Sequence, residues 1–310
     1  MTDLLDLADK LQDTNAAIAT MERALATAPT SEGAGIALRS LEHRRIVLER
    51  EFAKEANVQG IDIFRYSIAR DEPEFPVSAL ADALKSFQSW LTVVFDAIKT
   101  KTAKRRARVS ADIVALSTLD FGYSYPGSRG FVLTVPNQRL LLIDSDLDQS
   151  VIRMFHMLQA TSSEEILGYA REVGVAAVNS MYQWVENNSK YALATDIQWR
   201  RNDEIRQEIL FQAEEALNLK NIIERTSEEE QQTVSLVATL QGGDIQTRSF
   251  HLSFPEGEDV RGRMGETFSE PNEGLVLGSA YRAELLKRTS LSYSTGEEDI
   301  SWVLQTLTPI

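Results

Sequence analysis

Residues 233–254 read TVSLVATLQGGDIQTRSFHLSF, and this stretch decides the fold of the last quarter of the chain. Apolar and polar residues alternate on both sides of the Gly242-Gly243-Asp244 turn, which is the two-residue period of a half-buried β-strand. Similar patterns predict five short strands, near 233–241, 246–254, 258–264, 279–289 and 299–307. Five short strands are typical of a small β-barrel of the OB or SH3 type, because closure of the barrel removes exposed strand edges.

The first fifty residues have the period of a helix instead. Apolar residues spaced alternately by three and four form a heptad seam, interrupted at Thr14, that consists of Leu4, Leu7, Leu11, Ile18, Met21 and Leu25. Breaker residues at 29–35 separate this helix from a second one with similar spacing over 38–52, so we predict a coiled-coil-like antiparallel hairpin. The seam packs either on the body of the same chain or on a second subunit, and both interpretations stay open.

The middle of the chain mixes helical and strand patterns. Strands are predicted at 113–116, 121–125, 131–135 and 192–199, with a turn at 126–130. Helices are predicted after the caps Ser78, Asp146 or Asp148, Ser162 with Glu165, and Asn202 or Asp203. The third of these helices runs over 163–185, the fourth ends near 225, and residues 227–232 form a polar link. The predicted fold class is therefore α+β, with a helical hairpin at 1–72, a central mixed domain at 73–228 and a barrel module at 229–310.

Composition sets limits on function. The chain has 310 residues, 43% of them hydrophobic and 25% charged, with a formal net charge of −14, as expected for a globular protein of more than one domain. The absence of cysteine excludes disulfides, thiolate metal sites and cysteine nucleophiles. Neither a signal peptide nor a sufficiently long apolar segment is recognisable, so we expect a cytoplasmic protein without a membrane partner.

One basic run contrasts with the acidic composition. Six cations occur without an acidic residue among them, namely Lys99, Lys101, Lys104, Arg105, Arg106 and Arg108. They are candidates for contacts with an anion or with nucleic-acid phosphates. No aromatic residues interleave for base stacking, and the net charge of the chain disfavours nucleic acid. The alternatives are that the run complements the dipole of its own helix or pairs with the acidic surface of a sister subunit.

The residues that usually carry chemistry are dispersed. His43, His156 and His251 lie far apart, which argues against a zinc site. Asp144, Asp146 and Asp148 alternate like the first ligands of a calcium loop, but the remaining ligands of such a loop are missing, so we expect them to cap a helix. We predict no metal, no cofactor and no catalytic residue; an enzyme with a site assembled from scattered residues stays an alternative.

The C-terminal segment resembles a β-module of uncharacterised bacterial proteins. The resemblance is carried by Phe250-His251-Leu252-Ser253-Phe254, by Val260-Arg261-Gly262-Arg263, by residues 278–285 and by a closing strand after 295–298. In those proteins too, a helical and α+β body precedes a small barrel. The resemblance implies this architecture and a prokaryotic origin, and it transfers no activity.

Together these observations predict a non-enzymatic interaction or regulatory protein of the bacterial cytoplasm. It is expected to form homo-oligomers through the heptad seam and to present its barrel to a protein partner. The alternative is a nucleic-acid-associated protein that uses residues 99–108 together with the barrel.

Overall fold

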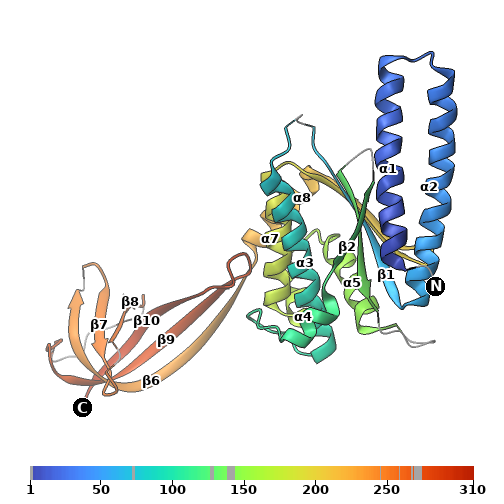
Figure 1. Ribbon diagram of the computed structural model, residues 1–310. Helices are drawn as coiled ribbons and strands as arrows, with labels where there is room; N and C mark the ends of the chain where they lie inside the picture. Colours follow the sequence, from blue (N-terminus) through green and yellow to red (C-terminus); the bar gives the residue numbers. More distant parts are fainter. Residues whose placement is uncertain are drawn as a thin grey trace. The chain divides into compact units, whose positions relative to one another are not determined.

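The computed structural model describes residues 3–71, 74–125, 129–137, 144–244, 246–257, 259–266, 268 and 274–310 (Figure 1). The chain forms two compact units, Met1–Arg225 and Thr226–Ile310. The predicted α+β class is confirmed, with an N-terminal helical pair, a central sheet with helices and a C-terminal barrel. The helical pair and the sheet belong to one unit, and their division into separate domains at 72/73 stays a prediction.

The two N-terminal helices are α1 (Leu4–Thr27) and α2 (Glu32–Val58). The Asp3 carboxylate accepts the Leu5 backbone N–H at the start of α1, and the Ser31 hydroxyl accepts the Ala34 N–H at the start of α2. The predicted hairpin is thereby confirmed, although the range 1–72 was wrong in being wholly helical, because residues 61–69 form a strand of the central sheet.

The central sheet is antiparallel throughout and has the order β2-β3-β1-β4-β5. Its strands are β1 (Ile61–Ala69), β2 (Asp120–Tyr125), β3 (Arg129–Pro136), β4 (Ala194–Arg201) and β5 (Glu204–Phe211). The other helices of this unit are α3 (Val77–Thr100), α4 (Ala111–Ser117), α5 (Asp146–Met157), α6 (Ser163–Val173), α7 (Val175–Lys190) and α8 (Ala213–Arg225). Figure 1 shows α1 and α2 on one side of the sheet and α3 and α7 on the other.

Each face of the sheet has its own apolar core. On the α3/α7 face, Trp90 of α3 stacks on Trp184 of α7 with ring centroids 5.7 Å apart, and the Trp184 indole N–H donates to the Tyr66 hydroxyl of β1 at 3.0 Å. On the other face, Leu11 of α1 and Phe52 of α2 are buried against Ile63 and Val132. Burial on both faces explains why β1 lies in the middle of the sheet.

The predicted strand at 113–116 is wrong, since these residues belong to helix α4. An apolar run of four residues fits either a strand or a helix, and the residues that it contacts decide which of the two forms. The Gln88 side-chain amide of α3 donates to the Ser117 carbonyl at 2.9 Å, while the Ser117 hydroxyl donates to Thr92 at 2.9 Å. These contacts satisfy the end of a helix docked on α3.

The helix predicted from Asn202 or Asp203 is also wrong over its first half. Both residues have positive φ, 49° and 66°, and form the two-residue turn of a hairpin between β4 and β5. Positive φ at both central positions defines a type I′ turn, which favours asparagine and aspartate and matches the twist of paired strands. The helix itself, α8, begins only at Ala213.

Several helix boundaries differ from those predicted. The helix at 163–185 is two helices, α6 and α7, separated by Gly174 with φ of 94°. The predicted Ser162–Glu165 capping box is confirmed. Helix α5 is capped by Ser145, with Asp148 completing its capping box, and the N-cap of α3 is Pro76 rather than Ser78. The predicted turn at 126–130 includes residues 126–128, which lie outside the described residues.

The C-terminal unit is a closed barrel with the strand order β10-β8-β7-β6-β9. Its strands are β6 (Ser227–Asp244), β7 (Ser249–Ser253), β8 (Asp259–Met264), β9 (Ala280–Ser292) and β10 (Glu298–Pro309). A parallel pair, β8 with β10, closes it, whereas the other neighbours are antiparallel. This strand order is that of the OB type, one of the two predicted barrels.

Residues 227–232 are predicted as a link, but they are the first part of β6 and pair with β9, so that prediction is wrong.

The glycine of the Val260-Arg261-Gly262-Arg263 motif lies inside the barrel. A Cβ at this position would overlap the Trp302 carbonyl oxygen and lie 2.8 Å from the Phe250 ring. Glycine at this position therefore permits β10 to approach β8.

Candidate functional site

The heptad seam lies between elements of its own unit. Leu7, Leu11 and Ile18 are buried, with exposures of 3%, 0% and 1%, whereas Leu4, Met21 and Leu25 are half-buried. The first two contribute to the core that α1 and α2 share with the sheet. The seam is thus largely covered within a single chain, and self-association through it stays a prediction.

The basic run divides into inward and outward cations. Lys99 Nζ lies 3.2 Å from Asp146, and Lys104 Nζ lies 2.5 Å from the buried Asp96. Lys101, Arg106 and Arg108 are exposed and form no ion pair with any described residue, and Arg105 is exposed as well. The structure therefore leaves part of the predicted cationic set available to a ligand.

The loop that carries these cations is fixed to the first unit by its backbone. A Cβ on Gly174 would lie 2.5 Å from the Lys104 N and O atoms, so the two backbones are in direct contact. The Ala176 N–H donates to the Lys104 carbonyl at 3.0 Å, and Lys104 Nζ donates to the Arg108 carbonyl at 3.2 Å. The cations consequently project from a loop with a defined backbone path.

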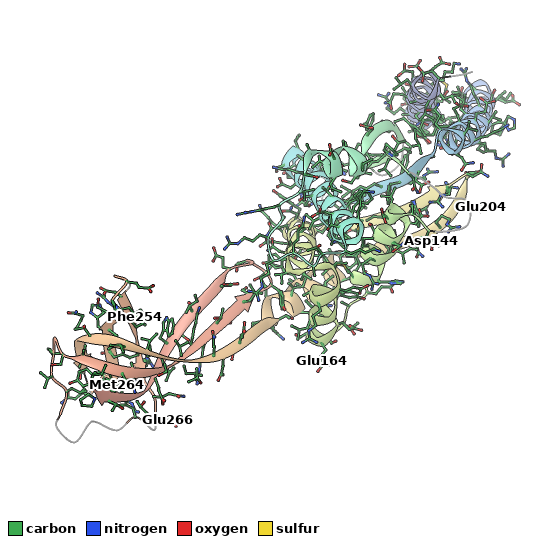
Figure 2. All side chains as sticks on the ribbon, turned by 90° about the horizontal axis from the view of Figure 1, so that it is seen from below. Asp144, Glu164, Glu204, Phe254, Met264 and Glu266 are labelled. Atoms are coloured by element: carbon green, nitrogen blue, oxygen red, sulfur yellow. The ribbon has the colours of Figure 1, made fainter. Side chains whose placement is uncertain are left out.

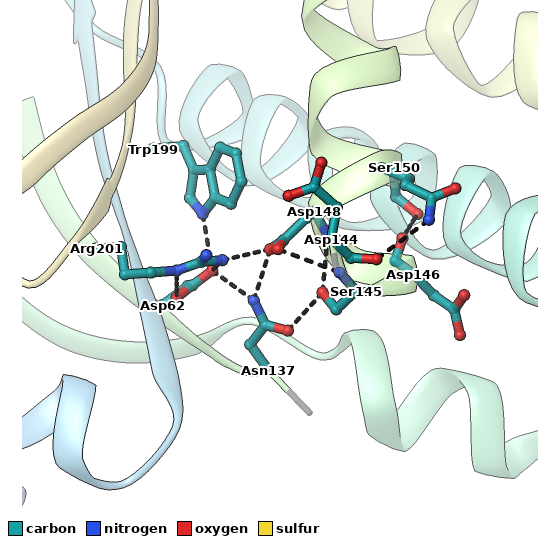
Figure 3. Close-up of polar contacts among 10 residues, drawn as sticks. Asp62, Asn137, Asp144, Ser145, Asp146, Asp148, Ser150, Trp199 and Arg201 are labelled. Atoms are coloured by element: carbon teal, nitrogen blue, oxygen red, sulfur yellow. Dashed lines mark hydrogen bonds and ion pairs between the residues drawn. The ribbon is translucent and has the colours of Figure 1, made fainter. Parts of the chain in front are cut away.

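A buried polar cluster joins the ends of three strands to helix α5 (Figure 3). The Arg201 guanidinium donates to Asp62 through Nε at 3.0 Å and through Nη2 at 2.8 Å, and Nη2 also donates to Asp148. The Asn137 amide donates to the same two carboxylates, at 2.7 and 2.8 Å. The Trp199 indole donates to Asp62 at 3.0 Å, and the Ser145 hydroxyl donates to Asn137 at 2.7 Å.

The cluster favours the ionised forms of Asp148 and Arg201. Burial alone would raise the pKa of Asp148, but hydrogen bonds from Arg201 and Asn137 and the charge of Arg201 hold that pKa below its ordinary value. Burial would likewise lower the pKa of Arg201, and its bonds to Asp62 and Asp148 raise it instead. A carboxylate whose pKa is held low, as that of Asp148 is, is a poor proton acceptor near neutral pH. Because the members of the cluster bond to one another, we describe the cluster as a structural clamp.

A small cleft of about 50 Å³ lies beside the clamp. It is lined by Asn137, Ser145, Asp146 and Lys99 together with apolar side chains of α3, α4 and α5. Its volume suits one or two water molecules rather than an organic substrate. Among the described residues no group of three His, Asp or Glu side chains could hold a metal ion.

The outer surface of the barrel carries polar and basic side chains on β7 and β8. Cross-strand pairs join Ser249 to Arg263 and His251 to Arg261, and His251 Nε2 lies 3.1 Å from an Asp259 carboxylate oxygen. The outward positions of these two strands hold no phenylalanine, tyrosine or tryptophan. The aromatic residues Phe250 and Tyr281 are buried in the core of the barrel.

The strands β6, β9 and β10 continue beyond the barrel as a three-stranded ribbon. β6 pairs with β9 from Ser227 to Thr239, but with β7 only from Thr239 onward. Figure 2 shows side chains standing on both faces of this ribbon. Along residues 227–238 one edge of β6 thus has no neighbouring strand among the described residues of the unit.

Sequence reasoning missed both the clamp and the ribbon edge. The clamp residues lie at 62, 137, 148 and 201, and no short motif contains two of them. The edge was missed because residues 227–232 resemble a solvated link. A usable signal is the length of the strand predicted near 279–289, which exceeds that of the strand predicted near 233–241.

None of the helices in the described ranges combines the length and the apolar character that a bilayer crossing needs. Comparison of the chain with protein-family models, with curated proteins and with solved structures finds no match.

Proposed function

We propose that the protein is an interaction protein that binds another polypeptide through its C-terminal unit. The observation that carries the proposal is the unpaired edge of β6 along residues 227–238, within a ribbon that continues beyond the closed barrel. An unpaired strand edge presents a row of free backbone donors and acceptors, which is a template for strand addition by a partner.

Exposed apolar side chains on the ribbon support the proposal. Val237 of β6 is 43% exposed and Ile300 of β10 is 46% exposed. Trp302 is only partly buried, and its ring lies 5.7 Å from Lys287 Nζ. Apolar and aromatic groups beside free backbone groups are the components of a peptide-binding surface.

Photo-crosslinking tests the proposal. Benzoylphenylalanine replaces Val237 or Ile300, and Val77, which is 83% exposed in the first unit, is the control position. After irradiation in the native host, we expect higher-mass adducts of the ribbon variants and none of the Val77 variant. Equal yields at all three positions, or no adduct at either ribbon position, would contradict the proposal.

Homo-oligomerisation through the heptad seam is a separate proposal. Its support is the apolar spacing of the seam and the partial exposure of Leu4, Met21 and Leu25. Light scattering behind a sizing column, at low and high salt, measures the native mass. A monomer at all concentrations would contradict it.

A second candidate function is binding of nucleic-acid phosphates by the basic loop. The observation that favours it is the fixed backbone at Lys104, which leaves Lys101, Arg106 and Arg108 outward and unpaired among the described residues. The barrel adds Arg261 and Arg263 on β8, a strand that binds oligonucleotides in other OB barrels.

This candidate is tested by titrating a labelled thymidine oligonucleotide at several salt concentrations. The double variant Arg106→Ala/Arg108→Ala should bind more weakly, and the slope of log affinity against log salt should fall by roughly 2, about 1 for each lost phosphate contact. Lys54→Ala/Lys85→Ala removes two exposed cations elsewhere in the unit and is the matched control. Affinity that does not respond to salt would contradict the candidate.

A further inference from the structure

We infer that the open edge of β6 receives an extended, basic segment of a partner protein, which adds to the ribbon as a further strand. The inference rests on the proposed function and names the chemistry of the partner. It is built from the direction of the backbone groups, their exposure, and the charges along the edge.

The direction of the backbone groups follows from the pairing with β9. The Leu240 N–H donates to the Ser279 carbonyl at 3.0 Å, and the Leu240 carbonyl accepts the Gly278 N–H at 2.8 Å, so both groups of Leu240 point toward β9. The register between β6 and β9 is unbroken from Ser227 to Thr239. Because backbone groups alternate in direction along a strand, the odd-numbered residues of this segment point theirs away from β9.

Between Glu229 and Val237, five residues thus turn both backbone groups toward the open edge, namely Glu229, Gln231, Thr233, Ser235 and Val237. All five are exposed. No described residue pairs with this side of the strand before Thr239, where β7 begins its ladder. An incoming strand would therefore continue the ladder that β7 makes with the second part of β6.

The charges along the edge indicate the partner's charge. Glu229 and Glu230 are exposed and form no ion pair with a described residue. Across β9, Glu229 lies in the same row as Asp299 of β10, since both are paired with Ser290. A strand added at the edge places a side chain beside each glutamate, where an opposite charge is favourable and a like charge is not.

The other end of the edge favours a partner segment of different composition. Around Thr233, Ser235 and Val237 the exposed side chains are small, polar or β-branched. Threonine and valine are typical cross-strand neighbours for such residues. The expected ligand is therefore an extended peptide with lysine or arginine at one end and alternating threonine and valine over the rest.

The test uses the full chain and a fluorescein-labelled peptide of alternating threonine and valine that ends in two lysines. The same peptide ending in two glutamates is the control ligand. We expect the lysine peptide to bind about tenfold more tightly in fluorescence anisotropy. The double variant Glu229→Lys/Glu230→Lys should abolish that preference, whereas Glu22→Lys/Glu51→Lys, with the same change in net charge, should retain it.

A proline variant tests the backbone ladder directly. Thr233→Pro removes an outward N–H while leaving the bonds to β9 intact, and proline is tolerated where the N–H of an edge strand faces solvent. Binding should weaken about tenfold relative to Thr233→Ala, with an unchanged far-ultraviolet circular dichroism spectrum. Because the spectrum is recorded for each variant, loss of binding is distinguished from loss of the fold.

Three outcomes would overturn the inference. They are equal binding by Thr233→Pro and Thr233→Ala, equal affinity for the two peptides, and a dimer in light scattering that Thr233→Pro converts to a monomer, which would assign the edge to a second copy. If crosslinks form at Val237 while the peptides show no preference, the inference fails and the proposed function stands. If crosslinks are absent as well, both fail.

Discussion

Arg201 lies between two carboxylates that the fold removes from solvent, since Asp62 is 0% exposed and Asp148 3%. A buried arrangement of this kind adds little net stability by itself, because desolvation of the charges offsets their attraction. It does constrain geometry, since its members come from β1, the end of β3, β4 and the start of α5. The clamp therefore fixes how helix α5 meets the strand ends.

Replacement of Arg201 by methionine should destabilise the first unit strongly. The substitution leaves two buried carboxylates without their cation, and breaking such a cluster costs about 3–5 kcal/mol. Urea denaturation followed by tryptophan fluorescence measures the loss. A change below about 1 kcal/mol would show that water reaches the carboxylates and that the clamp is unimportant.

The same variant should differ from the wild type in its pH dependence. The pKa of Asp148 is lowered in the folded state, so its contribution is present above the unfolded pKa and is lost as pH falls through the lowered value. In Arg201→Met the Asp148 carboxylate loses the cation that helps to lower its pKa. The stability difference between the two proteins should therefore shrink below about pH 4; a constant difference would contradict this account.

Gly262 is the other position where one residue decides local structure. Gly262→Ala places a methyl group against the Trp302 carbonyl and the Phe250 ring, so β8 and β10 must separate. We expect a loss of about 1–3 kcal/mol in the barrel, the usual cost of overpacking. Gly257→Ala in an open turn is not a matched control, because its φ is 89°; Gly168→Ala, with open space around it, is. Similar stabilities for Gly262→Ala and Gly168→Ala would be inconsistent with this packing.

At the scale of elements, the long periodic patterns predict correctly. The helical pair and the five barrel strands follow from alternation and heptad spacing, because each buries one continuous apolar face. The capping box at Ser162 and Glu165 was also predictable, since its partners lie three residues apart. Local chemistry is sufficient wherever both partners of an interaction are close in sequence.

The errors occur where distant partners decide the structure. Residues 204–208 are rich in helix-forming glutamate, arginine and glutamine, but pairing with β4 makes them a strand. Residues 227–232 form a strand because β9 extends far enough to pair with them. Propensity is a weak prior in both cases, and tertiary pairing overrides it.

The candidate surfaces show the same difference between features set by neighbouring residues and features set by distant ones. The basic run was predictable as a cluster, yet the inward direction of Lys104 depends on Asp96 and Gly174, which lie elsewhere in the sequence. The open edge of β6 was not predictable, because an edge exists only relative to the strands that stop short of it. The sequence thus identifies which residues are charged, whereas the fold determines which side chains and backbone groups a ligand can reach.

The seam of α1 provides a test at this scale. Leu11 is 0% exposed, so Leu11→Ala should lower the free energy of unfolding by about 2–5 kcal/mol through the cavity that it leaves. Leu5→Ala, at a position 70% exposed on the same helix, is the control. If Leu11→Ala changes the native mass while leaving the melting temperature unchanged, the seam belongs to a subunit interface instead.

The whole molecule consists of two units with separate cores. The barrel core is formed by residues from Ala238 to Leu307, and the cores of the first unit lie on the two faces of its sheet. Each unit is large enough to bury an apolar core of its own.

Residues 226–310, produced alone, should therefore fold. We expect a cooperative thermal transition in circular dichroism, because a closed barrel of this size contains its own core. A sloping signal without a transition would show that the barrel depends on the rest of the chain. The fragment 1–225 should give an independent transition in the same experiment.

The glutamates of β6 also have a consequence for solubility. An exposed edge of this length invites aggregation between molecules, and charged side chains are the usual protection against it. Glu229 and Glu230 are exposed at one end of the edge, where their negative charges oppose the approach of a second β6 edge. The double variant Glu229→Gln/Glu230→Gln removes both charges and keeps side chains of the same length. This variant should form thioflavin-binding assemblies at concentrations at which the wild type stays in solution.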